Sequence, residues 1–290
     1  MYIALIVLSA VIFSVQIAAS GQYSRREGGL LHKAMLLSFL SGTASCVLLL
    51  LTNREWMFTW FSFAFALISA LACVTMTWCG AQVLTRGDLS MYTLFSQMGG
   101  MIIPSVVGIL FYAEPLTWQR AVCIALVTAA TIIGRPVAGR KAGEKKQSGL
   151  VWYLAVFALN GVWCVFAKIH QSAPELAVSG PMYSLMIQML IVLLSGSILL
   201  PAVRRNKGLG LVKPRVSCPL AVCNGVLNTI GNLILLEALL HVDASIQYPI
   251  ATGGIMVLTV LIDYLFKRKP SKRTLISTGV AVIGLVLLAL

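Results

Sequence analysis

The 290-residue chain is 59% hydrophobic and only 11% charged, with a mean hydropathy of +0.91. These values lie far outside the range of soluble globular proteins and predict an all-α membrane protein. The formal net charge of +13 does not require a nucleic-acid partner, because the basic residues fall in loops between apolar segments, where anionic lipid head groups are the expected partners.

Ten apolar stretches follow one another along the chain, each close to the roughly 20 residues that a helix needs to cross a hydrocarbon core. We place the predicted spans at 2–23, 30–52, 57–84, 90–112, 116–134, 149–171, 180–201, 217–240, 244–266 and 272–290. The first span resembles a signal peptide with Ala-Ala-Ser at 18–20 as a cleavage site, but it lacks a basic leader, which favours a retained span. No soluble domain fits between the spans.

Basic residues are confined almost entirely to alternate loops. Of the 22 Lys and Arg, 19 lie in odd-numbered loops or at their edges, and the exceptions are Arg54, Arg120 and Lys168. Short loops rich in Lys and Arg stay cytoplasmic. This distribution predicts a multi-pass protein of the cell (inner) membrane with both termini on the non-cytoplasmic side.

The two halves of the chain carry the same residues at a fixed spacing. A shift of 155 residues without a gap superposes Asp88 on Asp243, Ser90 on Ser245, Gly99 on Gly254, Met101 on Met256, Phe111 on Phe266 and Pro115 on Pro270. The chain therefore reads as a tandem repeat of five spans. Because five is odd, the second copy must enter the membrane from the opposite side, which predicts two inverted five-helix repeats.

These features resemble the drug/metabolite transporter superfamily, EamA type. The likeness rests on the two five-span halves, the turn "AEPLTWQR" at 113–120, and "ALNGVWCVFAK" at 158–168, which opens the second half. It implies two EamA-like repeats, 1–145 and 146–290, around a central substrate cavity, with alternating access and no covalent chemistry. Two departures stand out: the first half has "LSAVIFSVQ" in place of the Trp-containing and Lys-containing motif, and many relatives keep both termini in the cytoplasm.

A stripe of polar residues at helical spacing marks a face turned away from lipid. The eighth span carries Asn224, Asn228 and Asn232, and the 155-residue shift places them on Ser69, Cys73 and Thr77 of the third span. Two related stripes at equivalent depth are what a pseudo-symmetric binding site requires. The alternative is that amide and small side chains only hold helices together.

The fourth and ninth spans supply further candidates. Thr93 and Gln97 correspond to Tyr248 and Thr252, and glycine pairs follow at 99–100 and 253–254. These glycines suit bending or close packing, with packing alone as the alternative. Side chains that could complete the walls are Tyr92, Gln247, Trp78, Trp163 and Asn160. Trp and Tyr near span ends are also common interfacial anchors.

Few ionisable residues lie within the spans. Lys168 and Glu237 fall near the outer ends of the sixth and eighth spans and could pair as a gate or coupling site, since unpaired charges at that depth are costly. Snorkelling of Lys168 to the interface is the alternative. Asp263, four residues from Lys267, is expected to be a surface partner.

The residues favour a carrier over an enzyme. The seven cysteines read as small apolar residues, no metal-ligand spacing or phosphate-binding loop occurs, and no cofactor or ATP-driven step is expected. Amide and hydroxyl walls suit a neutral or zwitterionic solute such as an amino acid or nucleoside. An exporter of organic cations and a membrane-embedded lipid-handling protein are the alternatives. The expected partners are a small-molecule substrate and the bilayer. A monomer is favoured, with an oligomer left open.

Overall fold

The computed structural model describes residues 2–86, 89–111, 117–133, 149–173, 175–205, 214–239, 244–266 and 270–289. These residues form helices with no strand among them. The helices are α1 (Tyr2–Glu27), α2 (Leu31–Thr52), α3 (Trp60–Arg86), α4 (Leu89–Phe111), α5 (Trp118–Ile133), α6 (Leu150–Gln171), α7 (Gly180–Arg205), α8 (Pro214–Leu239), α9 (Ala244–Leu265) and α10 (Lys272–Ala289). Their bounds lie close to those of the predicted spans.

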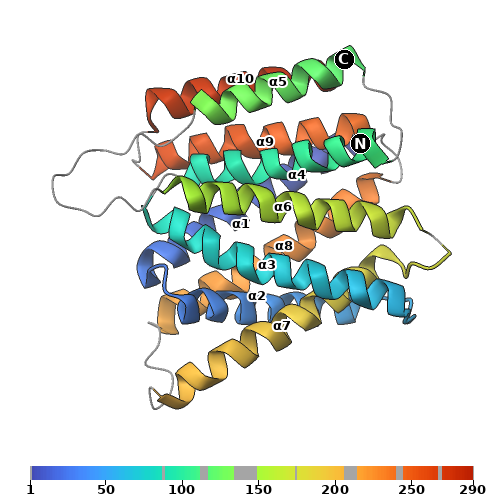
Figure 1. Ribbon diagram of the computed structural model, residues 1–290. Helices are drawn as coiled ribbons and strands as arrows, with labels where there is room; N and C mark the ends of the chain where they lie inside the picture. The colour runs from blue at the N-terminus through green and yellow to red at the C-terminus, as the bar shows by residue number, and fades with distance from the viewer. Residues whose placement is uncertain are drawn as a thin grey trace.

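The helices lie side by side with their ends at two opposite edges of the molecule (Figure 1). Within the described residues, seven helices are long and apolar enough to cross a membrane by length and composition: α1, α2, α3, α4, α6, α7 and α8. Helices satisfy their backbone hydrogen bonds internally, which hydrocarbon surroundings demand. The fold is therefore that of an all-α, multi-pass membrane protein, as the composition predicts.

Helices that are distant in sequence make the main packing contacts. Helix α1 packs along α8 and α9, α2 along α7 and α8, α3 along α6 and α7, and α4 along α6 and α9. Helices α5 and α10 pack against each other at one side of the bundle (Figure 1). The two halves of the chain are thus interleaved.

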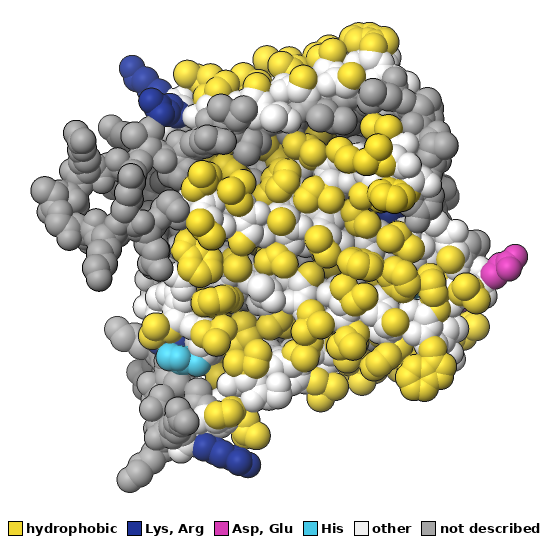
Figure 2. Space-filling view, in the orientation of Figure 1, with side chains coloured by type: hydrophobic (Ala, Val, Ile, Leu, Met, Phe, Trp, Pro, Cys, Tyr) yellow, Lys and Arg dark blue, Asp and Glu magenta, His cyan; other side chains and the backbone are white. Residues whose placement is uncertain are grey.

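Buried serines show how polar residues are tolerated inside these apolar helices. The hydroxyl of Ser14 donates to the carbonyl of Ala10 at 2.7 Å, and Ser195 bonds the carbonyl of Ile191 in the same manner. Such bonds to the preceding turn satisfy the hydroxyl without a partner helix. On the face that Figure 2 shows, the surface between the helix ends is mostly hydrophobic, and most of the visible charged side chains lie toward its edges.

Candidate functional site

An amide pair joins the first and eighth helices inside the bundle. Gln16 Nε2 donates to Asn224 Oδ1 at 2.7 Å, a contact between residues 208 positions apart. Both side chains are half-buried. Asn224 was predicted as a site residue from its spacing in the eighth span. Its contact with Gln16 was not predicted, because the sequence of one helix does not indicate which residue of another helix lies opposite.

The remaining asparagines of α8 bond to each other. Asn232 Nδ2 donates to the Asn228 carbonyl at 2.8 Å and lies 3.3 Å from Asn228 Oδ1. Asn228 is half-buried, whereas Asn232 is exposed. The stripe therefore divides into Asn224, which reaches α1, and a pair whose amides meet within α8. That all three line an enclosed cavity stays a prediction.

A second polar region lies where α4 meets α6. Asn160 Nδ2 donates to the carbonyl of Ser96 at 2.6 Å, and a Cβ at position 100 would lie 2.6 Å from the same nitrogen. The absence of a side chain at Gly100 thus makes room for the amide. This contact supplies a structural reason for one of the two paired glycines.

Threonine hydroxyls in this region are already engaged. Thr77 donates to the Cys73 carbonyl at 2.9 Å, and Thr93 donates to the Leu89 carbonyl at 3.0 Å. Each hydroxyl has one proton, so these two side chains could offer a ligand only an acceptor lone pair. Thr93 is also fully buried, which leaves it without access to a solute in this conformation.

The aromatic candidates differ in their contacts. Trp78 meets Trp152 edge to face, with ring centroids 5.3 Å apart, and Tyr92 packs on Gly80, where a Cβ would lie 2.9 Å from its ring. Trp163 is different, because its Nε1 is buried without a hydrogen-bond acceptor among the described residues. A buried donor of this kind is costly unless a ligand or water completes it.

Several predicted residues give less information. Gln97 and Thr252 are half-buried, as is Lys168, whereas Glu237 is exposed. The side chains of Gln247 and Tyr248 lie outside the described part of the structure. The pairing of Lys168 with Glu237 as a gate stays a prediction, as does the role of the other site residues.

Asp263 is a correction to the sequence interpretation. Its side chain is fully buried, and Oδ2 accepts hydrogen bonds from the Ser90 backbone N–H at 2.9 Å and the Ser90 hydroxyl at 2.6 Å. Oδ1 has no partner among the described residues. The spacing to Lys267 suggested a surface pair, but Asp263 instead binds the first turn of α4, where free backbone N–H groups attract a carboxyl group.

Two further buried groups were not singled out as site residues. His170 is 2% exposed and contacts Ser62, with 2.9 Å between Nε2 and Oγ. Glu27 is 8% exposed, and its carboxyl group accepts a hydrogen bond from Ser217. The 155-residue shift superposes Ser62 on Ser217. This match between the two serines is the sequence signal that could have drawn attention to their partners, His170 and Glu27.

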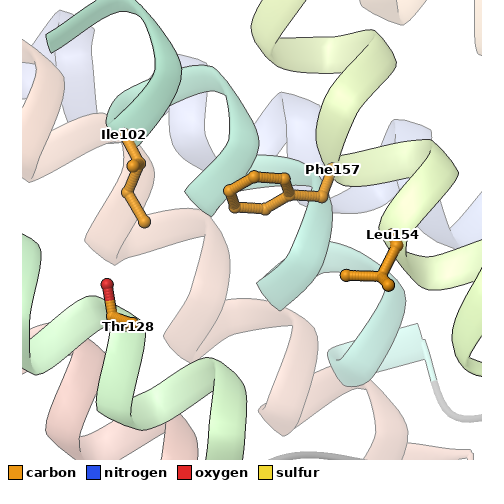
Figure 3. Close-up of a pocket in the computed structure, with 4 residues that line it drawn as sticks. All are labelled: Ile102, Thr128, Leu154 and Phe157. Carbon is orange, nitrogen blue, oxygen red and sulfur yellow. The ribbon is translucent and has the colours of Figure 1, made fainter. Parts of the chain in front are cut away.

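A small apolar cavity of about 140 Å³ lies between α4, α5 and α6. Its lining side chains are Ile102, Thr128, Leu154 and Phe157, and the Phe157 ring extends toward Ile102 (Figure 3). None of the polar candidates named above borders it. Among the described residues there is also no cluster of three His, Cys, Asp or Glu that could hold a metal ion.

Comparisons with known proteins concern the fold alone. No protein-family model matches the chain, and no curated protein matches it. Among 26 matching chains of solved structures, one described as "Crystal structure of protein" superposes with a TM-score of 0.61 at 16% sequence identity. The superposition covers 98% of this chain and 95% of the other. The chain is therefore similar in fold, over nearly its whole length, to a solved crystal structure.

Proposed function

We propose that the chain is a secondary membrane transporter that moves a small polar metabolite, neutral or zwitterionic, by alternating access. The resemblance of its motifs to EamA-type members of the drug/metabolite transporter superfamily supports this proposal. Ten helices whose bounds match the ten apolar stretches support ten spans. No ATP hydrolysis and no covalent change of the substrate belong to this mechanism.

The pattern of helix packing carries the proposal. Replacing each helix by its equivalent in the other half, five helices along the chain, turns one packed pair into another. The pair α1–α8 becomes α6–α3, α1–α9 becomes α6–α4, and α2–α8 becomes α7–α3, and the helices of every one of these pairs pack together. The pairs α2–α7, α4–α9 and α5–α10 are exchanged with themselves. Two inverted five-helix units, 1–145 and 146–290, account for this pattern, and rocking of one unit against the other gives alternating access.

Polar contacts at the junction of the two units support a polar solute. The amide pair of Gln16 and Asn224 joins α1 to α8, and Asn160 joins α6 to α4. Both contacts link one unit with the other, and Trp163 adds a buried donor without an acceptor among the described residues. Amide groups and an indole N–H recognise carbonyl, carboxylate and amide groups of a solute.

The charge distribution supports an orientation with both termini on the non-cytoplasmic side of the cell membrane. The loops that carry 19 of the 22 basic residues all alternate with loops that are nearly free of them, and the basic set is expected in the cytoplasm. A reporter enzyme that is active only outside the cytoplasm, fused after the last residue, should be active. A reporter active only in the cytoplasm would contradict this orientation if it worked at the same position.

Binding and uptake test the function directly. The purified full-length protein should be stabilised by one class of small polar metabolite in a thermal-shift screen, by about 2.7 kcal/mol when the ligand reaches roughly 100 times its Kd. Vesicles that contain the protein should then take up the radiolabelled compound unchanged. Recovery of a chemically altered compound would favour an enzyme, and stabilisation by lipophilic cations alone would favour the exporter alternative.

Trp163→Phe gives the uptake assay a residue-specific readout. The change removes a buried donor that has no acceptor among the described residues, so stability should be maintained while affinity for the solute falls about fivefold to tenfold, the value of one hydrogen bond. Trp60→Phe is the matched control, because Trp60 is 77% exposed. Loss of stability with unchanged affinity would identify Trp163 as a packing residue.

A further inference from the structure

A buried histidine joins three segments at one end of the bundle. The cluster, here called the His170 latch, consists of Thr59 and Ser62 at the start of α3, His170 at the end of α6, Val178 in the α6–α7 connection, and Tyr183 of α7. The rings of His170 and Tyr183 stack with centroids 3.8 Å apart and an interplanar angle of 12°. Ser62 Oγ lies 2.9 Å from His170 Nε2 and accepts the Val178 backbone N–H at 3.0 Å.

The hydrogen bonds of Ser62 fix the protonation state of His170 in this latch. A hydroxyl has one proton and two lone pairs. Ser62 Oγ accepts from the Thr59 hydroxyl at 2.8 Å and from the Val178 N–H, so both lone pairs are used. Its proton must therefore go to His170 Nε2, which requires a neutral imidazole whose proton is on Nδ1.

A buried glutamate holds the corresponding segments at the other end. The Glu27 latch consists of Glu27 at the end of α1, Ser217 at the start of α8, and Lys33 at the start of α2. Ser217 Oγ donates to Glu27 Oε1, and Lys33 Nζ lies 3.5 Å from Glu27 Oε2. Tyr23 adds a hydrogen bond from its hydroxyl to the Lys33 carbonyl at 2.9 Å.

The two latches are equivalent parts of the two halves. The 155-residue shift superposes Ser62 on Ser217, and in each latch that serine joins the first turns of α3 or α8 to the last turn of α6 or α1. The third helix contributes Tyr183 of α7 to the His170 latch and Lys33 of α2 to the Glu27 latch. The α6–α7 connection lies at the right edge of Figure 1 and the α1–α2 connection at the left edge, so the latches close opposite ends of the bundle.

We propose that the coupling ion of this transporter is the proton, and that His170 and Glu27 are the residues whose protonation opens the two latches. This inference rests on the proposed function. A proton taken from water onto His170 Nε2 turns an acceptor into a donor, so Ser62 loses an acceptor for its own proton and either Thr59 or Val178 loses its partner. A proton on the Glu27 carboxyl group removes the ion pair with Lys33. Both latches are closed in this structure.

Groups that face the two residues are consistent with this response. His170 stacks on Phe61 of α3 and Tyr183 of α7 and contacts Ser62 of α3. The Val178 N–H of the α6–α7 connection bonds the same Ser62 oxygen. The charged residues nearest in the chain are Glu175, which is exposed in the α6–α7 connection, and Lys168, two residues before His170 on α6. Helix α4 ends at the same edge of the bundle with the apolar residues Leu110 and Phe111. The charged or titratable groups at the Glu27 end include Tyr23, Arg25 and Arg26 of α1, His32 and Lys33 of α2, Cys218 of α8, and Asp263 of α9, which binds Ser90 of α4. The exposed Arg204 of α7 and Lys272 and Arg273 of α10 lie at the same end.

Hydrogen exchange of the whole protein in lipid nanodiscs tests the His170 latch without any substrate. After correction for intrinsic rates, exchange in residues 175–179 should rise about fivefold to tenfold, the value of one hydrogen bond, as the pH falls from about 8.5 to about 4.5, a range that extends well below the titration of an ordinary histidine. His170→Gln, which keeps an acceptor and cannot be protonated in this range, should abolish the rise. His32→Gln, a change of the half-buried histidine at the other end, should leave it intact.

Glu27→Gln mimics the protonated carboxyl group and tests the second latch. Exchange in residues 28–33 should rise at every pH while residues 175–179 keep their wild-type response, and thermal unfolding of each variant shows whether it is folded. Exchange at 175–179 that ignores pH, or that still responds in His170→Gln, overturns the proposal. Because no solute is present, this result is independent of the uptake assay. Solute uptake without proton movement would support the carrier function and contradict proton coupling through the latches. Latches that respond to pH in a protein that binds no solute would contradict the carrier function alone.

Discussion

Gly99→Ala should be among the most destabilising single substitutions in the chain. Helices α4 and α6 cross at this residue, and a Cβ there would lie 1.9 Å from the Phe157 carbonyl oxygen and 2.8 Å from the Phe157 Cα. These are backbone atoms, so no side-chain rotation relieves the clash. Overpacking typically costs about 1–3 kcal/mol and occasionally more, and we expect about 3 kcal/mol or more, measured by thermal unfolding in detergent.

Two other glycines give a graded comparison with Gly99. Gly254 is its equivalent in the second half, where a Cβ would lie 3.1 Å from the Ala10 Cβ, so Gly254→Ala should cost clearly less. Gly279 of α10 has nothing within 4 Å of an added Cβ, so Gly279→Ala should be neutral or stabilising by up to about 1 kcal/mol, the difference in helix propensity. Equal stability of Gly99→Ala and Gly279→Ala would contradict the close approach of α4 and α6.

The helices were predictable because one physical requirement dominates their sequence. Hydrocarbon surroundings demand an apolar helix of sufficient length, and the ends of α2 at Leu31 and Thr52 fall within a residue of the predicted 30–52. The partners of each helix were not predictable. Lipid-facing and core-facing surfaces are both apolar, and the amide of Gln16 in α1 does not by itself reveal that its partner Asn224 lies on α8.

Polar contacts between helices were predictable only where a polar side chain would be costly against lipid. Asn160 and Asn224 were identified because amides in a membrane helix need a partner, and each has one. Asn232, identified by the same reasoning, bonds within its own helix. His170 and Glu27 were not identified as site residues because the serines that bind them lie 108 and 190 positions away, and sequence spacing within one helix carries no information about such contacts.

Asp263→Ala should destabilise the protein by about 2–4 kcal/mol, because two buried donors of Ser90 lose their acceptor. Without the carboxyl group, both the backbone N–H and the hydroxyl of Ser90 lose the acceptor that lies 2.9 and 2.6 Å away. Each buried donor left without a partner costs about 1–3 kcal/mol. Thermal unfolding in detergent measures the loss, and Asp263→Asn, which keeps a carbonyl oxygen for Ser90, should retain most of the stability.

Glu55→Ala separates this buried role from that of an ordinary surface acid. Glu55 is exposed in the α2–α3 connection, and surface substitutions of this kind usually stay within about 0.5 kcal/mol of wild type. If Asp263 lay at the surface, as its spacing to Lys267 suggested, Asp263→Ala and Glu55→Ala would have the same free energy of unfolding. A large loss for Asp263→Ala alone, partly recovered in Asp263→Asn, requires the junction of α4 and α9 to be closed around the carboxyl group, and it would make Asp263 a structural anchor between the two halves.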